Sequence, residues 1–153
     1  MKNEKYGFTL LELIVVIFII SLATALIMPS FMQSPESALK SEAKHISSTM
    51  RYVYDQAMGR KEDYIFRINP ENSSWGFEGS SERKTFKAKE DVKFKDVLIP
   101  SAGELTTKEV TVKFGPLGPE EPIVIHLISS EIEYTVIFNH LNGKSKILEG
   151  YIL

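Results

Sequence analysis

The sequence predicts an α+β fold in which a long N-terminal helix, partly transmembrane, packs on a small antiparallel β-sheet head. Three observations predict it. The 153 residues allow one domain with an appendage, since single domains typically have about 50–250 residues. Residues 1–35 contain 21 hydrophobic residues and only four of the 38 charged ones. From about residue 63 onward, apolar and polar residues alternate, which is typical of strands with one buried face.

The composition excludes several classes of protein. The chain has no cysteine, so it has neither a disulfide framework nor a thiolate metal site, and its redox compartment cannot be inferred. Its formal net charge is −2, whereas a general polyanion binder normally has a strong basic excess. Residues 148–153 are acidic and apolar. We therefore expect no nucleic-acid partner.

The apolar N-terminus is long enough for a transmembrane helix. No charged residue occurs from Leu13 to Pro35, and about 20 apolar residues span a bilayer core. Lys2 and Lys5 precede the run, which argues against a buried helix of a soluble protein. A secretory signal peptide is the other alternative, because a basic start, an apolar run and the small-x-small pattern of residues 23–25 are all present.

Glu12 distinguishes this N-terminus from an ordinary signal peptide. It places a carboxylate at the start of the apolar run. A charge inside a membrane helix costs a few kcal/mol on insertion scales, and such residues usually have a partner. Glu12 is therefore a candidate functional residue.

Residues 5–12, KYGFTLLE, followed by an aliphatic run, resemble the class III leader of type IV prepilins and type II secretion pseudopilins. The resemblance implies that a prepilin peptidase cuts between Gly7 and Phe8 and methylates the new amine of Phe8. Residues 1–7 would then be a cleaved leader, and the apolar helix would stay in the product. The family commonly has a helix-loosening proline where Pro29 stands.

The resemblance also implies a role for Glu12. Its carboxylate would pair with the new amine of Phe8 on a neighbouring subunit as the helices pack into a filament. A buried charge is costly unless it is paired, so a subunit out of register would leave both charges unpaired. The alternative is that Glu12 lies in the headgroup layer and has no such role.

The chain becomes amphipathic after Pro35. Apolar residues recur at helical spacing, while charged residues that include Glu42 fill the other faces. We expect a nearly continuous helix from Phe8 to about Met58, capped or restarted at Ser34 or Ser37, kinked at Pro29 and Pro35, and stopped near Gly59. Residues 8–35 would form its membrane or filament-core half, residues 36–60 its amphipathic half, and residues 61–153 the head. The predicted buried face comprises Leu39, Ala43, Ile46, Met50, Val53 and Ala57.

The head is predicted to contain six to eight short antiparallel strands. Residues 78–91 are polar and indicate a loop or a weak edge strand. Asn142-Gly143 is a strong hairpin signal. The expected strands are Tyr64–Ile68, Ser74–Phe77, Val92–Lys95, Val110–Phe114, Ile123–Ile128, Ile132–Phe138 and Lys144–Ile152.

The C-terminal half is similar to minor pseudopilins of the GspH/FimT type. That family has a strand, an F-x-P-x-G-like turn, another strand, and a strand ending in a Gly-Lys-like hairpin. Residues 114–118, FGPLG, fit the turn, and Gly59-Arg60 fits a step before the first strand. Glu120-Glu121 lacks the alternating oxygen ligands of the calcium loop found in major pseudopilins. This absence and the lack of cysteine favour a minor subunit.

The sequence contains no recognisable catalytic motif. His45, His126 and His140 fall in different predicted elements without an accompanying carboxylate cluster, which favours structural roles. Trp75 is predicted to belong to the core, with Phe77 and Phe86, rather than to an exposed aromatic patch. We expect no catalytic residue, no metal site and no cofactor, so the chain is predicted to be an enzyme's substrate rather than an enzyme.

Together, the two resemblances imply a minor, tip-associated pseudopilin of a type II secretion system. Its partners would be other pseudopilin subunits, the prepilin peptidase, the inner membrane and secreted cargo. The chain would cross the inner membrane once, with its head in the periplasm or outside the membrane, before it enters a filament. The alternatives are a minor type IV pilin or competence pseudopilin, and a secreted soluble binding module released by ordinary signal peptidase.

Overall fold

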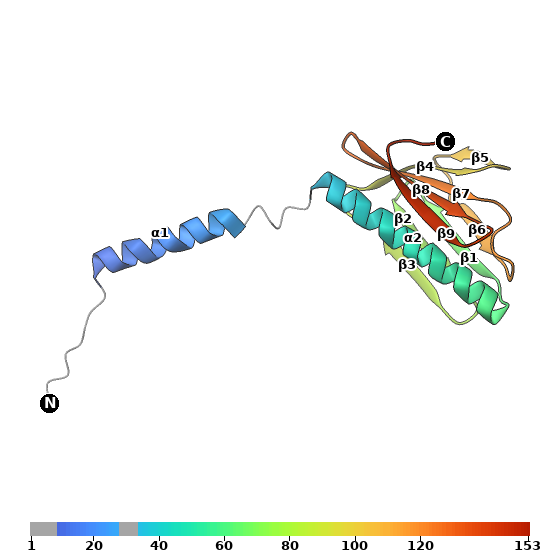
Figure 1. The fold of residues 1–153 in the computed structure, drawn as a ribbon, viewed down its shortest axis with the longest axis horizontal. Coiled ribbons are helices and arrows are strands. Elements are labelled where there is room, and N and C mark those ends of the chain that lie inside the picture. The colour runs from blue at the N-terminus through green and yellow to red at the C-terminus, as the bar shows by residue number, and fades with distance from the viewer. Residues whose placement is uncertain (1–8, 28–33) are drawn as a thin grey trace, which may run out of the picture. The chain divides into compact units, whose positions relative to one another are not determined.

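A computed structural model describes residues 9–27 and 34–153. The contacts divide the chain into two compact units, residues 1–33 and residues 34–153. The first contains helix α1 (Leu10–Ile27), and the second contains helix α2 (Pro35–Arg60) and the β-strands (Figure 1). The strands are β1 (Tyr64–Asn69), β2 (Ser74–Glu78), β3 (Arg83–Lys87), β4 (Lys93–Ile99), β5 (Gly103–Leu105), β6 (Val110–Phe114), β7 (Ile123–Ser129), β8 (Ile132–Asn139) and β9 (Lys144–Glu149).

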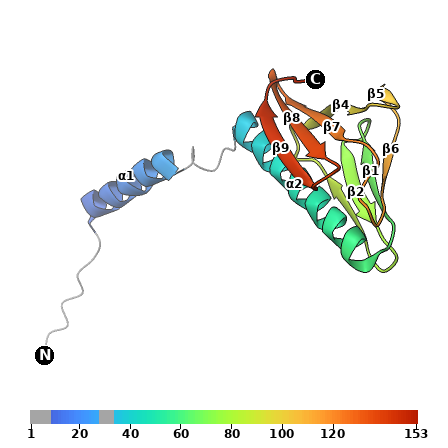
Figure 2. The same cartoon turned by 45° about the vertical axis from the view of Figure 1, so that its right-hand side comes forward.

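The strands of the head form two antiparallel sheets. One has the order β3-β2-β1-β6, and the other has the order β5-β4-β7-β8-β9. Helix α2 packs against strands of both sheets (Figure 2). The predicted α+β class, a helix on antiparallel strands, is confirmed. The nine strands among the described residues exceed the six to eight expected, because β3 forms an edge strand within the polar stretch and β5 adds a short hairpin.

The amphipathic face of α2 forms one wall of the core. All six residues predicted for this face are fully buried, as the helical spacing of apolar residues requires. They pack with large side chains from both sheets, among them Phe66 of β1, Phe114 of β6 and Phe138 of β8. The 3.6-residue period therefore predicted the helix face that holds the two sheets together.

The predicted cap at Ser34, rather than at Ser37, is confirmed, whereas the prediction that the helix is nearly continuous and merely kinked at Pro35 is wrong there. The backbone of Ser34 is extended, with φ −64° and ψ 148°, and its hydroxyl accepts a hydrogen bond from the N–H of Ser37 at 3.2 Å. Ser34 is thus the N-cap of a new helix. The physical reason is Pro35, whose ring disfavours the helical conformation of the preceding residue and is itself well tolerated at the first helical position.

Helix α2 also ends later than the sequence predicted. Gly59 lies inside the helix, and Lys61 forms the C-cap in the left-handed conformation with φ 56°. The N–H of Lys61 donates to the carbonyl of Ala57, which satisfies one carbonyl of the last turn. Glycine is common but not required where a helix ends in the left-handed conformation. The prediction from Gly59 therefore placed the end of the helix two residues too early.

Two turns that each contain a glycine pack against the ring of Tyr54 near the end of α2. Gly118 and Gly143 both have positive φ, 87° and 64°. A Cβ on Gly143 would lie 2.4 Å from Cδ1 of Tyr54, and one on Gly118 would lie 2.6 Å from Cε2 of the same ring. The Tyr54 hydroxyl donates to the carbonyl of Leu141 at 3.2 Å. Both turn motifs singled out in the sequence therefore dock on one helix residue.

Replacing Gly143→Ala should destabilise the head by about 2–4 kcal/mol, because left-handed backbone strain adds to a steric overlap with Tyr54. Gly103→Ala is the matched control, since Gly103 has φ 74° but a Cβ added to it would have no heavy atom within 4 Å. Urea unfolding of the detergent-solubilised chain, followed by circular dichroism, measures both. Equal losses in the two variants would show that the Tyr54 contact contributes nothing.

Candidate functional site: the N-terminal segment and the head surface

The sequence-predicted site residues lie in the N-terminal unit. Gly7, Phe8 and Pro29 fall outside the described residues, so cleavage at Gly7, methylation at Phe8 and the kink at Pro29 remain predictions. Glu12 is described, in the first turn of α1. Of the predicted site residues, Glu12 is therefore the one whose surroundings the structure describes.

Glu12 forms a reciprocal cap with Thr9 at the start of α1. The N–H of Glu12 donates to Oγ1 of Thr9 at 3.2 Å, and the N–H of Thr9 donates to Oε2 of Glu12 at 3.5 Å. The Thr9 carbonyl accepts the first helical bond, from the N–H of Leu13. This is a capping box, with Thr9 as N-cap and Glu12 as the third helical residue. Glu12 thus has a local structural partner as well as the intersubunit partner that the family resemblance implies.

The rest of α1 is apolar around its whole circumference. From Leu10 to Leu22 the large hydrophobic side chains are exposed. The two hydroxyls of the helix bond back to backbone carbonyls, Ser21 to Ile17 at 2.8 Å and Thr24 to Ile20 at 2.6 Å. Such back-bonding satisfies a hydroxyl without water. A helix that is apolar on every side needs lipid or other helices around it.

Within residues 9–27 and 34–153, the helices fall short of the length and apolarity needed to cross a membrane. Helix α1 has 18 residues, which at a rise of about 1.5 Å extend about 27 Å. A hydrocarbon core is about 30 Å thick. The predicted single-pass span therefore remains a prediction.

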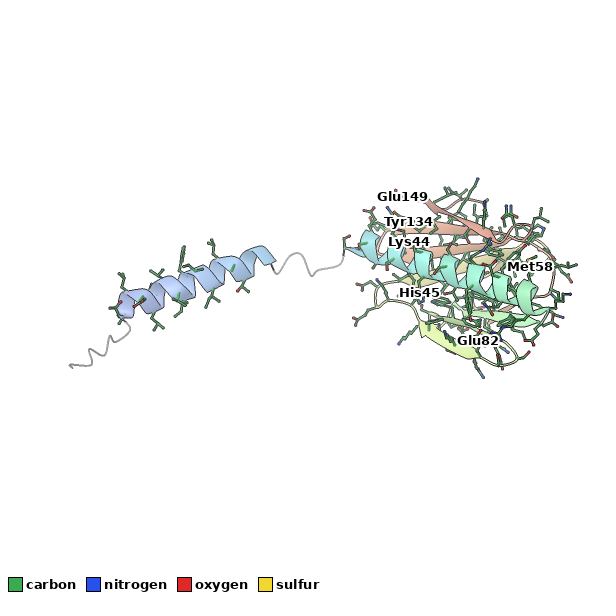
Figure 3. All side chains as sticks on the ribbon, turned by 60° about the horizontal axis from the view of Figure 1, so that its bottom comes forward. Lys44, His45, Met58, Glu82, Tyr134 and Glu149 are labelled. Atoms are coloured by element: carbon green, nitrogen blue, oxygen red, sulfur yellow. The ribbon has the colours of Figure 1, made fainter. Side chains whose placement is uncertain are left out.

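In the head, α2 carries a buried carboxylate that the sequence placed on an exposed face. Glu42 is 3% exposed, and its Oε1 accepts a hydrogen bond from Nε1 of Trp75 at 2.8 Å. The exposed residue His45, one turn further along α2, is labelled in Figure 3. Its ring meets those of Trp75 and Phe86 edge-on, with centroids 4.8 Å from each. Trp75 and Phe77 are buried and Phe86 is partly buried, which confirms their assignment to the core.

The Glu42–Trp75 contact predicts a measurable difference between two variants. Trp75→Phe leaves the buried carboxylate without its donor and should cost about 1–3 kcal/mol beyond the lost packing. Glu42→Gln keeps an oxygen acceptor for the indole N–H and should cost less than about 1 kcal/mol. Urea unfolding followed by circular dichroism compares them. If Trp75→Phe were no more destabilising than Glu42→Gln, the hydrogen bond would have no net stabilising effect.

One histidine has a carboxylate partner that the sequence did not reveal. His126 of β7 is fully buried, and its Nδ1 lies 2.5 Å from Oδ1 of Asp96 in β4. Asp96 is a single carboxylate and not the cluster whose absence favoured structural histidines, but its proximity to His126 was not predicted from the sequence. The two residues are 30 positions apart in the sequence. Their contact depends on the pairing of β4 with β7 and on a bulge in β4, and no local sequence pattern predicts either feature.

The described residues contain no group of three or more His, Asp or Glu side chains positioned to hold a metal ion. Glu121 instead accepts a hydrogen bond from the N–H of Ser101 at 2.8 Å. A cleft of about 540 Å³ lies beside the 115–119 turn, with both apolar and charged residues in its lining. Leu117, at the tip of this turn, is 90% exposed.

Comparison with known proteins supports the N-terminal assignment and the fold. The family model of the prokaryotic N-terminal methylation motif matches residues 2–28, which include Gly7, Phe8 and Glu12. The structure resembles that of the minor pseudopilin EpsH from the type 2 secretion system of Vibrio cholerae, with a TM-score of 0.54 and 15% identity. This likeness covers 72% of the present chain and 96% of the EpsH chain. No curated protein sequence matches the chain.

The chain therefore has a prepilin-type methylation motif over residues 2–28 and a pilin-like α+β fold similar to that of EpsH. Both predictions are confirmed. The capping box is the feature that sequence reasoning overlooked. Its signal was present, because Thr9-Leu10-Leu11-Glu12 has the form of a threonine followed three residues later by a glutamate before an apolar run.

Proposed function

We propose that this protein is a minor pseudopilin, a structural subunit of the filament of a type II secretion system. The observation that carries the proposal is the carboxylate of Glu12 at the head of an exposed apolar helix, inside the matched methylation motif. Prepilin peptidase removes residues 1–7 and methylates Phe8. The helix then holds the subunit in the inner membrane, with the head on the periplasmic side, until assembly.

Helix α1 supports both steps. Its apolar surface is compatible with lipid and with the apolar helices of other subunits. The cap with Thr9 engages Glu12 through Oε2, and a carboxylate has about four lone-pair positions. The carboxylate of Glu12 can therefore cap α1 and also accept a hydrogen bond from the methylated amine of Phe8 on a neighbouring subunit. In a low-dielectric helix bundle, that pairing favours the correct register.

The head supplies contacts rather than chemistry in this proposal. Its one buried histidine–carboxylate pair, Asp96 and His126, is covered by residues 150–152 and bonded to their backbone. The exposed apolar residue Leu117 and the cleft beside it are available to other pseudopilins or to secreted cargo. We place the subunit at or near the filament tip, and the fold is compatible with that position because it is similar to the fold of the minor pseudopilin EpsH. The formal charge of −2 disfavours nucleic acid as a partner.

A minor type IV pilin or a competence pseudopilin is the second candidate, because the methylation motif is compatible with each of these filaments. Deleting the gene in the producing organism separates the candidates. We expect a loss of protein secretion with unchanged surface pili and unchanged DNA uptake. Loss of pili or of DNA uptake with normal secretion would contradict the assignment to a secretion system.

A further inference from the structure

The five-stranded sheet carries a buried polar cluster on the face that points away from α2. His126 lies between Ile125 and Leu127, whose side chains enter the core, so its ring is on the opposite face. Asp96 and Thr135 are its register partners on the two neighbouring strands. The three polar residues are at most 3% exposed. Polar side chains on an outer sheet face are normally solvated, so something must cover them.

Residues 150–152 provide that cover, and two of them are bound through their backbone. Oγ1 of Thr135 donates to the Gly150 carbonyl at 2.6 Å and accepts from the N–H of Ile152 at 3.1 Å. Nε2 of His126 lies 3.0 Å from the Ile152 carbonyl. The predicted last strand would have extended to Ile152, but β9 ends at Glu149 and Gly150 turns the chain with φ 91°. Figure 1 shows the C-terminal end of the chain beside β4 and β5.

The side chain of Tyr151, in the same segment, also makes specific contacts with the sheet. The ring of Tyr151 stacks on that of His126, with a centroid distance of 3.9 Å and an interplanar angle of 21°. Its hydroxyl donates to Oε1 of Glu104 at 2.7 Å, and Nζ of Lys95 lies 4.5 Å from the ring centroid. These contacts form a slot for an aromatic residue between β4, β5 and β7.

A β-bulge builds this slot. The pairing of β4 with β7 shifts register between Phe94 and Asp96. Phe94 and Val97 are both buried in the core, so Lys95 and Asp96 both lie on the outer face, where regular alternation would place only one. Lys95 consequently reaches Tyr151, and Asp96 reaches His126.

We propose that Asp96, His126 and Thr135 form a proton-dependent binding site for an extended peptide segment with an aromatic residue, which the chain's own residues 150–152 occupy. The Ile152 carbonyl can only accept a hydrogen bond, so Nε2 of His126 must carry a proton. The contact between Nδ1 and Asp96 then needs a second proton, on either partner. Without it, two acceptors would face each other at 2.5 Å, or a change of tautomer would turn an acceptor toward Ile152.

Binding of the segment is therefore coupled to proton uptake, and it weakens as the pH rises. The other charged groups around the site are already paired. Lys95 pairs with Glu133 of β8 at 2.6 Å, and Glu104 of β5 accepts from Tyr151. The hydrogen bond to Glu104, together with burial, raises the pKa of Tyr151 to about 12, so the phenol stays neutral at moderate pH. The Asp96–His126 pair is the group whose proton the segment requires.

Nuclear magnetic resonance of the full chain in detergent micelles tests the site. The heteronuclear NOE of the Ile152 and Leu153 amides is measured from about pH 6 to about pH 9. We expect rigid amides at low pH and mobile ones at high pH, with the bound-to-free ratio falling by up to about tenfold per pH unit, as release of one proton requires. An NOE that stays constant over this range in the unmodified chain would overturn the proposal.

Two variants locate the effect. Asp96→Asn combined with His126→Gln keeps an N–H donor for the Ile152 carbonyl but removes the shared proton, so the NOE should no longer depend on pH. Glu104→Gln is the matched control, because it removes a charge beside Tyr151 and keeps an oxygen acceptor, and it should retain the pH dependence. Unchanged pH dependence in the double variant, or its loss in the control, would contradict the assignment. The result does not depend on the proposed role in filament assembly.

Discussion

The variant Gly7→Leu should abolish removal of residues 1–7 and leave the full-length chain in the membrane fraction. In the family that the leader resembles, the peptidase cuts directly after this glycine, so a bulky side chain at Gly7 should prevent cleavage. The mature form is expected to fall below about a tenth of the total. Intact mass of the membrane-extracted protein distinguishes the two forms.

Tyr6→Leu serves as the control for this prediction. It places a similar bulk one residue earlier and leaves Gly7, Phe8 and Glu12 unchanged. We expect normal processing of this variant, whereas the uncut Gly7→Leu chain retains Lys2 and Lys5 ahead of the apolar helix and should fail to enter filaments. Normal trimming of Gly7→Leu would refute the leader assignment.

Glu12→Gln should leave processing intact but reduce incorporation into the filament by at least about tenfold. The amide cannot neutralise the methylated amine of a neighbouring subunit. An unpaired charge in a helix bundle costs several kcal/mol, and about 1.4 kcal/mol corresponds to a factor of ten. Co-sedimentation of the subunit with sheared filaments, normalised to its amount in the membrane, measures the effect.

The capping box supplies the control that separates two roles of Glu12. Glutamine also serves as the third helical residue of a capping box, so Glu12→Gln keeps the cap and loses the charge. Thr9→Ala does the reverse, since it removes the Oγ1 acceptor, at about 1 kcal/mol, and keeps the carboxylate. Near-normal assembly of Glu12→Gln with impaired assembly of Thr9→Ala would show that Glu12 acts only as a cap.

Local periodicity predicted most of the head. The helical spacing of α2 identified the whole core face, and alternation located strands such as β1, β6 and β8 to within two residues. The predictions failed where the conformation or burial of a residue depends on the adjacent residue or on a strand distant in the sequence. Pro35 acts on the residue before it, so the helix restarts at Ser34. Glu42 was placed among the exposed charges because its partner Trp75 is 33 residues away.

One candidate site could be predicted from local sequence, and the other could not. The N-terminal motif is contiguous, so the sequence alone predicted the leader that the family model matches within residues 2–28. Thr9 and Glu12 are close enough in sequence for their cap to be recognisable. The cluster of Asp96, His126 and Thr135 depends on strand register, on a bulge and on the segment that covers it. None of these has a signature within a short window of sequence.

If this chain is a processed and methylated filament subunit, its mature N-terminus carries the products of both reactions. Mass spectrometry of the protein purified from the membrane of the producing organism should show a chain that begins at Phe8 and carries one methyl group on its amine. A chain that begins at Leu26, after the small-x-small pattern of residues 23–25, would contradict the account, because ordinary signal peptidase would then have released the head without its helix.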